Sequence, residues 1–187
     1  MALTYEIALL AAGGAIKAAE LAAGREPAFA LIRPPGHHAS RDHCWGFCFF
    51  NNMAISIAKL RKEGKIETAL IVDIDLHFGD GTSNIFENTP QVMYFHPEGR
   101  NRHEFVDGVS RFLAQTKADV VAVSAGFDRY EEDWGGLLKT EDYETIGKLV
   151  KEWAERVCQG KRYGVLEGGY NLNVLGRNVK ALLKGMS

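Results

Sequence analysis

The sequence predicts an α/β fold with three layers, helix, sheet and helix, around a mainly parallel sheet. Short apolar runs rich in β-branched residues alternate along the chain with longer stretches at helical spacing. The short runs are apolar almost without interruption, which is typical of strands covered on both faces. With 187 residues, 46% hydrophobic and 25% charged, the composition is that of a globular protein, and we expect residues 1–187 to form a single domain.

Five strands are expected in the order of the chain. They are AFALIR (28–33), TALIVDID (68–75), QVMYFH (91–96), DVVAVSA (119–125) and YGVLEG (163–168). Five helices are expected around them, at residues 4–23, 52–62, 102–117, 141–159 and 172–184. Expected N-caps are Thr4, Asn51, Thr140 and Asn171, and expected stops are Gly24, Gly64 and Gly160.

Charge and cysteine content exclude several classes of function. The formal net charge is −2 and no block of like charges occurs, so direct nucleic-acid or membrane-surface binding is not expected. Cys44, Cys48 and Cys158 do not form a disulfide framework and suit a reducing cytoplasm. The apolar start lacks a basic region and contains Glu6, so it does not predict an export signal, and the run 7–16 is too short to span a membrane.

Polar and glycine-rich loops follow four of the five expected strands. The segments are PPGHHASRDHCWGFCFFNN, DLHFGDG, GFDRYEEDWGG and EGGYN. In a parallel sheet, ligands bind beyond the carboxyl ends of the strands. We therefore expect these loops to converge on one rim and to form the functional site.

A metal site is predicted at this rim. Asp73, Asp75 and His77 alternate, so an extended segment would point them the same way. Asp75 and His77, joined by a carboxylate such as Asp128 after the fourth strand, would make the three-ligand set of a catalytic zinc site. The spacing alone is equally compatible with residues that cap turns in a solvated acidic loop.

The adjacent His37 and His38 would supply a general base and an electrostatic partner, each oriented by a carboxylate on its far ring nitrogen. Asp73 and Asp80 are available for that task. The simpler alternative is a pair of surface histidines in a polar loop.

Two further features of the loops leave alternatives open. His38, His43, Cys44 and Cys48 form a rival set for structural zinc, but their spacing is poor and buried apolar cysteines explain it better. In EGGYN, the two glycines would place Tyr170 at the rim, where its phenol could donate to an oxyanion or simply cover the core. Glu167 is ambiguous.

The motifs RPPGHHA, GFCFFNN, DIDLHFGDGT, SAGFD and LEGGYN, in this order, resemble those of the zinc-dependent histone deacetylase superfamily. This superfamily includes acetoin utilization proteins and acetylpolyamine amidohydrolases, and it shares its fold with arginase. LEGGY is similar to the prokaryotic branch. The resemblance runs from the first helix nearly to the C-terminus.

The resemblance implies a role for each matching residue. Asp75, His77 and Asp128 would bind Zn²⁺, and His37 and His38 would be catalytic. Further assignments are Asp73 and Asp80 as orienters of His37 and His38, Tyr170 as the group that polarises the acetyl carbonyl, and Phe47, Gly46, Gly168 and Gly169 as substrate-binding residues. Backbone carbonyls near Asp73, Asp75 and His77 match the family's inner K⁺ site.

Departures from the family pattern affect the predicted substrate channel. The sequence begins at the TYEIALLAAGG helix, without the family's usual N-terminal segment, so we expect a sheet truncated at one side. An exposed sheet edge of this kind would favour homo-oligomers. The stretch after VMYFHPEGR is short, and the loop with a second channel aromatic is not evident.

The function expected from the resemblance is a zinc-dependent deacetylase, and the cysteine content favours a location in the cytoplasm. Its substrate would be a small acetylated amine, an acetylpolyamine or an acetyl-lysine protein, hydrolysed by metal-activated water. Two alternatives remain open. One is a family member that binds metal or acyl groups with impaired turnover, and the other is an arginase-like binuclear manganese hydrolase.

Overall fold

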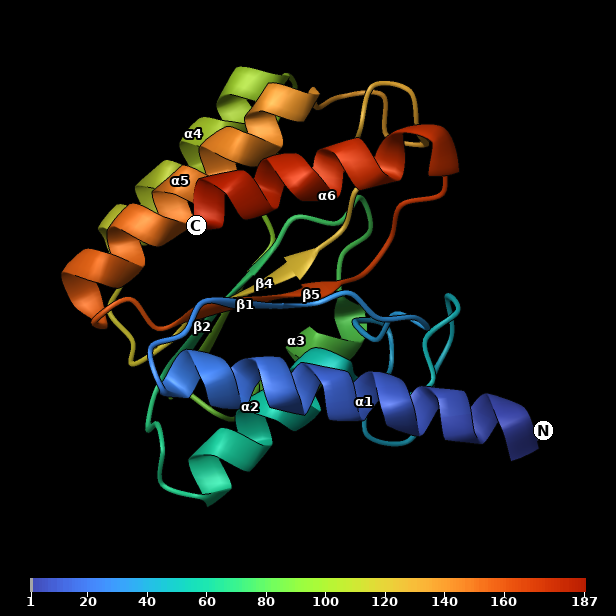
Figure 1. The fold of residues 1–187 in the computed structure, drawn as a ribbon, viewed down its shortest axis with the longest axis vertical. Helices are drawn as coiled ribbons and strands as arrows, with labels where there is room; N and C mark the ends of the chain where they lie inside the picture. Colours follow the sequence, from blue (N-terminus) through green and yellow to red (C-terminus); the bar gives the residue numbers. More distant parts are fainter. Residues whose placement is uncertain (1) are drawn as a thin grey trace.

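The computed structural model describes residues 2–187 and has one five-stranded sheet between two layers of helices (Figure 1). All strand pairs are parallel, and the spatial order is β1-β5-β4-β2-β3. The strands are β1 (Ala28–Ala30), β2 (Ala69–Asp73), β3 (Val92–Phe95), β4 (Val121–Ala125) and β5 (Arg162–Leu166). The predicted fold class is therefore confirmed.

Helices cover both faces of the sheet. They are α1 (Ala2–Ala23), α2 (Asn52–Lys62), α3 (Asp80–Phe86), α4 (Arg102–Ala114), α5 (Thr140–Val157) and α6 (Leu172–Met186). Helices α1, α2 and α3 lie below the sheet in Figure 1, and α4, α5 and α6 lie above it. Successive side chains of β2 point to opposite faces of the sheet, so Leu70 packs in the core on one face and Ile71 in the core on the other. This explains the uninterrupted apolar strands.

The expected elements are found, with differences at their ends. Asn51 caps α2 by accepting a hydrogen bond from the Ala54 amide (2.9 Å), and Asn171 caps α6. Thr4 and Thr140 are not caps, because α1 already begins at Ala2 and α5 begins at Thr140 itself. The helix α3 was not expected, because seven residues are too few to show a helical period.

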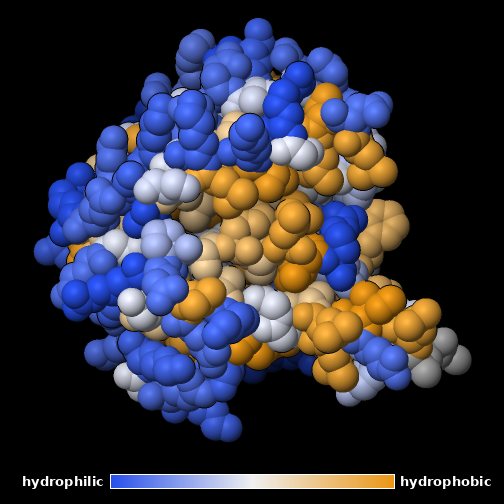
Figure 2. Space-filling model, viewed as in Figure 1, coloured by the Kyte–Doolittle hydropathy of each residue, from blue (hydrophilic) through white to orange (hydrophobic). Residues whose placement is uncertain are grey.

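The strand β1 forms one edge of the sheet and pairs only with β5. Figure 2 shows apolar side chains along this side of the molecule and over the outer part of α1, where Leu3, Ile7 and Leu10 are exposed. No helix within residues 2–187 is both long and apolar enough to cross a membrane.

Candidate active site

Asp75, His77 and Asp128 form a compact cluster beyond the carboxyl ends of the neighbouring strands β2 and β4. Their ligand atoms all lie within 4.8 Å of one another, and within residues 2–187 this is the one such cluster of metal-binding side chains. The His77 Nδ1 atom lies 3.3 Å from Asp75 Oδ1 and 3.2 Å from Asp128 Oδ2. The structure thus brings together the three predicted metal ligands from two separate loops.

Backbone amides hold the two carboxylates in place. The Gly168 amide donates to Asp75 Oδ2 (2.8 Å), and the Leu76 amide donates to Asp128 Oδ1 (2.9 Å). Gly168 must be a glycine, because a Cβ atom there would lie 2.6 Å from Asp75 Oδ2 and 2.8 Å from Asp128 Oδ2. The other oxygen of Asp128 is buried and accepts no hydrogen bond within the described chain.

The electrostatics of this cluster fit a bound cation. Burial, together with the charge of Asp75, raises the pKa of Asp128 to about 7. The hydrogen bond to Asp75 raises the pKa of His77, because two carboxylates face its imidazole. Two carboxylates and one imidazole, with one carboxylate oxygen that accepts no hydrogen bond within the described residues, match the three-ligand set of a divalent metal with an open position.

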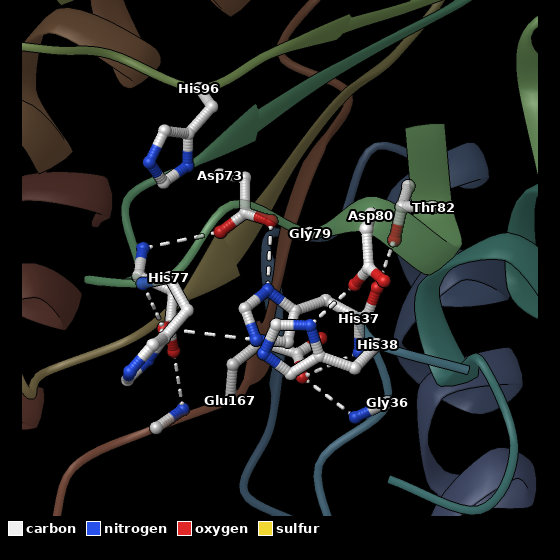
Figure 3. A network of polar contacts seen from close by, with 12 residues as sticks. Gly36, His37, His38, Asp73, His77, Gly79, Asp80, Thr82, His96 and Glu167 are labelled. Atoms are coloured by element: carbon white, nitrogen blue, oxygen red, sulfur yellow. Dashed lines mark hydrogen bonds and ion pairs between the residues drawn. The ribbon is translucent and has the colours of Figure 1, made fainter. Parts of the chain in front are cut away.

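The tandem histidines lie beside this cluster, each with its own carboxylate (Figure 3). His37 Nδ1 donates to Asp73 Oδ2 (3.1 Å), and His38 Nδ1 donates to Asp80 Oδ1 (2.6 Å). The free His37 Nε2 lies 3.7 Å from Asp75 Oδ1. Both histidines are buried rather than exposed on the surface, so the alternative of two surface histidines is wrong.

The two histidines differ in their pKa values. Burial lowers the pKa of His37, but the charge of Asp73 and the hydrogen bond with it outweigh burial and raise that pKa to about 10. Burial and the positive charge of His37 lower the pKa of His38 below its usual value, although Asp80 acts in the opposite direction. His37 is therefore cationic at neutral pH, and His38 is neutral.

Several residues that support the histidines were missed in the sequence. The Tyr94 hydroxyl donates to Asp73 Oδ2 (2.9 Å) and accepts from the Gly79 amide (2.8 Å). The indole of Trp45 donates to Asp80 Oδ2 (2.9 Å). A Tyr in a strand and a Trp in a loop carry no sequence signal of such contacts, because only the tertiary fold brings them to these carboxylates.

Glu167, ambiguous in the sequence, is fully buried and fixes the histidine loop. Its Oε2 atom accepts hydrogen bonds from the Gly36 amide (2.7 Å) and the His37 amide (3.1 Å). Burial raises the pKa of Glu167 to about 7, although the charge of His37 opposes the rise. The side chain of Arg33 donates to its backbone carbonyl (2.7 Å), which ties the same loop to the end of β5.

Aromatic side chains line the rim above the metal cluster. The Tyr170 ring stacks on Trp134, with centroids 3.9 Å apart, and lies 6.0 Å from the ring of Phe47. Burial and the charges of Asp75 and Asp128 raise the pKa of Tyr170 to about 12, so its phenol keeps its proton. Gly46 and Gly169 have positive φ values, and a Cβ atom at Gly46 would lie 2.5 Å from His38 Cδ2.

The rival zinc set is not gathered. His38 Nδ1 is bound to Asp80, and the exposed His43 hydrogen-bonds with Ser40 and Asp42. Cys44 is exposed, whereas Cys48 is buried, and burial raises the pKa of the Cys48 thiol. Cys48 accepts a hydrogen bond from the His38 amide (3.4 Å), so it supports the histidine loop.

The comparison with family models decides the identity of this fold and site. The histone deacetylase domain model matches residues 1–105 and 96–186. The chain belongs to the histone deacetylase family. The expectation drawn from the five motifs is therefore confirmed at the level of the family.

Curated relatives of this chain are named as deacetylases or as an acetylpolyamine amidohydrolase. A probable deacetylase of Archaeoglobus fulgidus is 33% identical over 206 residues, covering 90% of this chain and 57% of the relative. The acetylpolyamine amidohydrolase of Mycoplana ramosa is 31% identical over 224 residues, covering 98% of this chain and 64% of the relative. The chain thus spans about three fifths of the length of these relatives.

Solved structures agree with this assignment. An acetylpolyamine aminohydrolase from Burkholderia pseudomallei superposes with a TM-score of 0.81 at 27% identity, covering 94% of this chain and 60% of that chain. The HD domain of HDA15 superposes with a TM-score of 0.77 at 30% identity, covering 95% of this chain and 61% of that chain.

Arg129 occupies the other side of the loop that carries Asp75. Its Nε atom donates to the Asp75 carbonyl oxygen (2.9 Å), and its Nη2 atom donates to the Leu76 carbonyl oxygen (3.2 Å). The resemblance implies a K⁺ ion among the carbonyls of this segment. A potassium ion does not fit at these two oxygens, because a guanidinium already donates to both and would repel a second cation.

Proposed function

We propose that this member of the histone deacetylase family is a zinc-dependent amidohydrolase that removes acetyl groups from N-acetylated amines. The observation that carries the proposal is the position of Asp75, His77 and Asp128 directly beside two buried histidines, each paired with a carboxylate. A metal site flanked by an acid–base pair is a combination that can hydrolyse an unactivated amide.

Zinc is the metal that we assign to the cluster. The donor set of one imidazole and two carboxylates leaves a position free for water or substrate. When bound, the metal would supply Lewis acidity, which polarises a carbonyl group and lowers the pKa of water toward about 7.

The histidines would divide the proton transfers between them. Neutral His38 has its Nδ1 atom engaged by Asp80, so its Nε2 atom is free to take a proton from the attacking water. The same atom would return that proton to the leaving amine. Cationic His37, held by Asp73, would place positive charge beside the negative charge that develops on the acyl group.

Tyr170 would donate a hydrogen bond from its protonated hydroxyl to the acyl oxygen as that oxygen gains charge. Stacking on Trp134 fixes the ring plane of Tyr170 and so lowers the cost of orienting it. Hydrolysis would consume one water and release acetate and a free amine. Phe47, whose ring centroid lies 6.0 Å from that of Tyr170, would line the acyl channel.

The substrates that we propose are small acetylated amines, acetylpolyamines and acetyl-lysine side chains. Support comes from the exposed aromatic residues of the rim, Phe47 and Trp134, which offer apolar surface to an acyl chain and cation–π contacts to an amine. The three free thiols favour a reducing cytoplasm as its location.

Metal loading combined with acetate release tests this function. The chelated protein should be inactive, and one equivalent of ZnCl₂ should restore acetate release from an acetyl-lysine peptide or an acetylated diamine. Tyr170→Phe should lower kcat by about 10² to 10³-fold with zinc still bound, and the exposed Tyr5→Phe is the matched control. Zinc binding without release of acetate would instead favour the family member with impaired turnover, and full activity of Tyr170→Phe would contradict its role.

A further inference from the structure

Arg129 is a buried cation, and within residues 2–187 no carboxylate accepts a direct hydrogen bond from its guanidinium. The side chain is 9% exposed, and its donors go to the carbonyl oxygens of Asp75 and Leu76 and to His96 Nε2 (2.8 Å). The guanidinium also lies over the ring of Phe105, 4.8 Å from its centroid. Since burying an ion without a paired charge is costly, its position calls for a reason beyond packing.

The position of Arg129 in the chain links both metal-binding loops. It follows Asp128 directly, and its side chain reaches back to the loop of Asp75 and His77. Its own carbonyl accepts from the Leu137 and Leu138 amides (2.9 and 2.8 Å), so its backbone is also fixed.

The peptide groups around Leu76 are held from two directions. The Leu76 amide donates to Asp128 Oδ1, and the Leu76 carbonyl accepts from Arg129 Nη2. Asp128 and Arg129, which are neighbours in the chain, therefore hold Leu76, the residue between Asp75 and His77, at both its amide and its carbonyl. The Asp75 carbonyl, one of those that match the family's K⁺ site, accepts from Arg129 together with the neighbouring Leu76 carbonyl.

His96 completes the arrangement on the side of β3. Burial lowers the pKa of His96, so its imidazole is neutral and its Nε2 atom can accept from the guanidinium. An imidazole and two carbonyls give the guanidinium three neutral acceptors. Neutral oxygen acceptors of this kind also coordinate K⁺ in other proteins.

We propose that Arg129 takes the place of the potassium ion in this chain. Its tethered guanidinium positions the segment from Asp75 to His77 for metal binding, and zinc affinity needs no alkali ion. The inference rests on the metal site of the proposed function and is independent of the substrate.

The first test needs only the wild-type protein. Zinc affinity, from competition with a chromophoric chelator, and the thermal midpoint are measured in KCl and in choline chloride at equal ionic strength. We expect less than a twofold difference in zinc affinity and equal thermal midpoints. A saturable rise of either quantity with KCl would overturn the proposal. Failure to bind zinc in either salt would contradict the metal site itself and is thereby distinguished.

The second test asks whether K⁺ can replace the Arg129 side chain once that side chain is removed. Arg129→Ala in choline chloride should bind zinc about 10 to 100-fold more weakly, as is typical when a group that orients metal ligands is removed. Part of this loss should return in KCl, since the two carbonyl oxygens are then free to face K⁺. Wild-type affinity of Arg129→Ala in choline chloride, or a loss that KCl does not reverse, would overturn the proposal.

Arg162→Ala is the matched control. Arg162 is also a buried arginine that donates to two backbone carbonyls, those of Met186 (2.6 Å) and Gly160 (3.0 Å), but it lies at the start of β5, away from the metal site. The Arg162→Ala variant should have a lower thermal midpoint than the wild type. Its zinc affinity should equal that of the wild type and should not depend on KCl. If Arg129→Ala does not fold, the wild-type comparison of salts still decides.

Discussion

The two sides of the loop that carries Asp75, Leu76 and His77 solve the same electrostatic problem in opposite ways. On one side, the side chains of Asp75 and His77 meet Asp128, and negative charge is left for an external cation. On the other side, the carbonyls of the same loop meet the guanidinium of Arg129. In the proposed function, the first cation is a metal ion from solution, whereas the second is a side chain of the protein itself.

The difference follows from what each side must do. A catalytic metal needs an open position for substrate, which a guanidinium with fixed donors cannot offer. A cation that only holds carbonyl oxygens needs no open position and gains from being tethered, because its occupancy does not depend on concentration. The comparison predicts large effects on the metal side and smaller effects on the arginine side.

Asp128→Asn should have the largest effect. It removes one of the two carboxylates from the metal cluster. The remaining carboxylate, Asp75, is already ionised, because against the effect of burial the hydrogen bond from His77 holds its pKa well below the usual range, so it cannot supply further negative charge. We expect loss of zinc stoichiometry in elemental analysis and a fall in kcat/KM greater than the 10 to 100-fold that is typical of residues that only orient ligands. The exposed Asp107→Asn is the control. One zinc per chain in the Asp128→Asn variant would show that Asp128 is not a metal ligand.

Asp80→Asn should have a smaller effect with a diagnostic pH dependence. The hydrogen bond and charge of Asp80 raise the pKa of His38 against the effects of burial and of His37. Removing that charge lowers the pKa of His38 further, so the acid limb of kcat/KM should move to lower pH. At pH 8 the rate should fall about 10 to 100-fold, because the ring loses its orienting partner. An acid limb that moves to higher pH would exclude His38 as the base.

Gly168→Ala should weaken zinc binding about tenfold through crowding alone. The added methyl group would meet oxygens of both Asp75 and Asp128 and force them apart. Gly176→Ala is the matched control, because nothing lies within 4 Å of the added methyl group and α6 should gain about 1 kcal/mol. Equal zinc affinity in both variants would contradict the close packing of this glycine on the ligands.

His96→Leu should have the smallest effect, since Arg129 keeps both carbonyl acceptors. We expect a loss of about 1 kcal/mol in the free energy of unfolding for one missing hydrogen bond, with zinc affinity changed less than threefold. The exposed His103→Leu is the control in urea titrations. A tenfold loss of zinc affinity in His96→Leu would mean that the imidazole, rather than the carbonyl pair, fixes Arg129.

The sequence predicts the part of this site that is governed by period and by strand position. Asp75 and Asp128 follow buried apolar strands, and the parallel sheet brings such strand ends to one rim. The sequence alone made Asp73 and Asp80 available as orienting carboxylates, and the resemblance implied which histidine each one orients; the structure contains the pairs His37–Asp73 and His38–Asp80.

The remaining parts depend on side-chain destinations that no local pattern encodes. Arg129 was not singled out in the sequence, because only the packing of two loops brings it to the carbonyls of Asp75 and Leu76. Glu167 lies directly after β5 and contacts the histidine loop, and Tyr94 lies in β3 and contacts Asp73. Both contacts join segments that are far apart in the sequence. The expected K⁺ ion was implied by the resemblance alone, and the structure has the Arg129 guanidinium at the Asp75 carbonyl of that segment.

Anomalous scattering from crystals grown with zinc and soaked in rubidium chloride tests the central claim most directly. The account predicts a zinc peak between Asp75, His77 and Asp128, and no rubidium peak at the Asp75 and Leu76 carbonyl oxygens, with Arg129 donating to both. A rubidium peak at those oxygens, or zinc bound elsewhere, would contradict it.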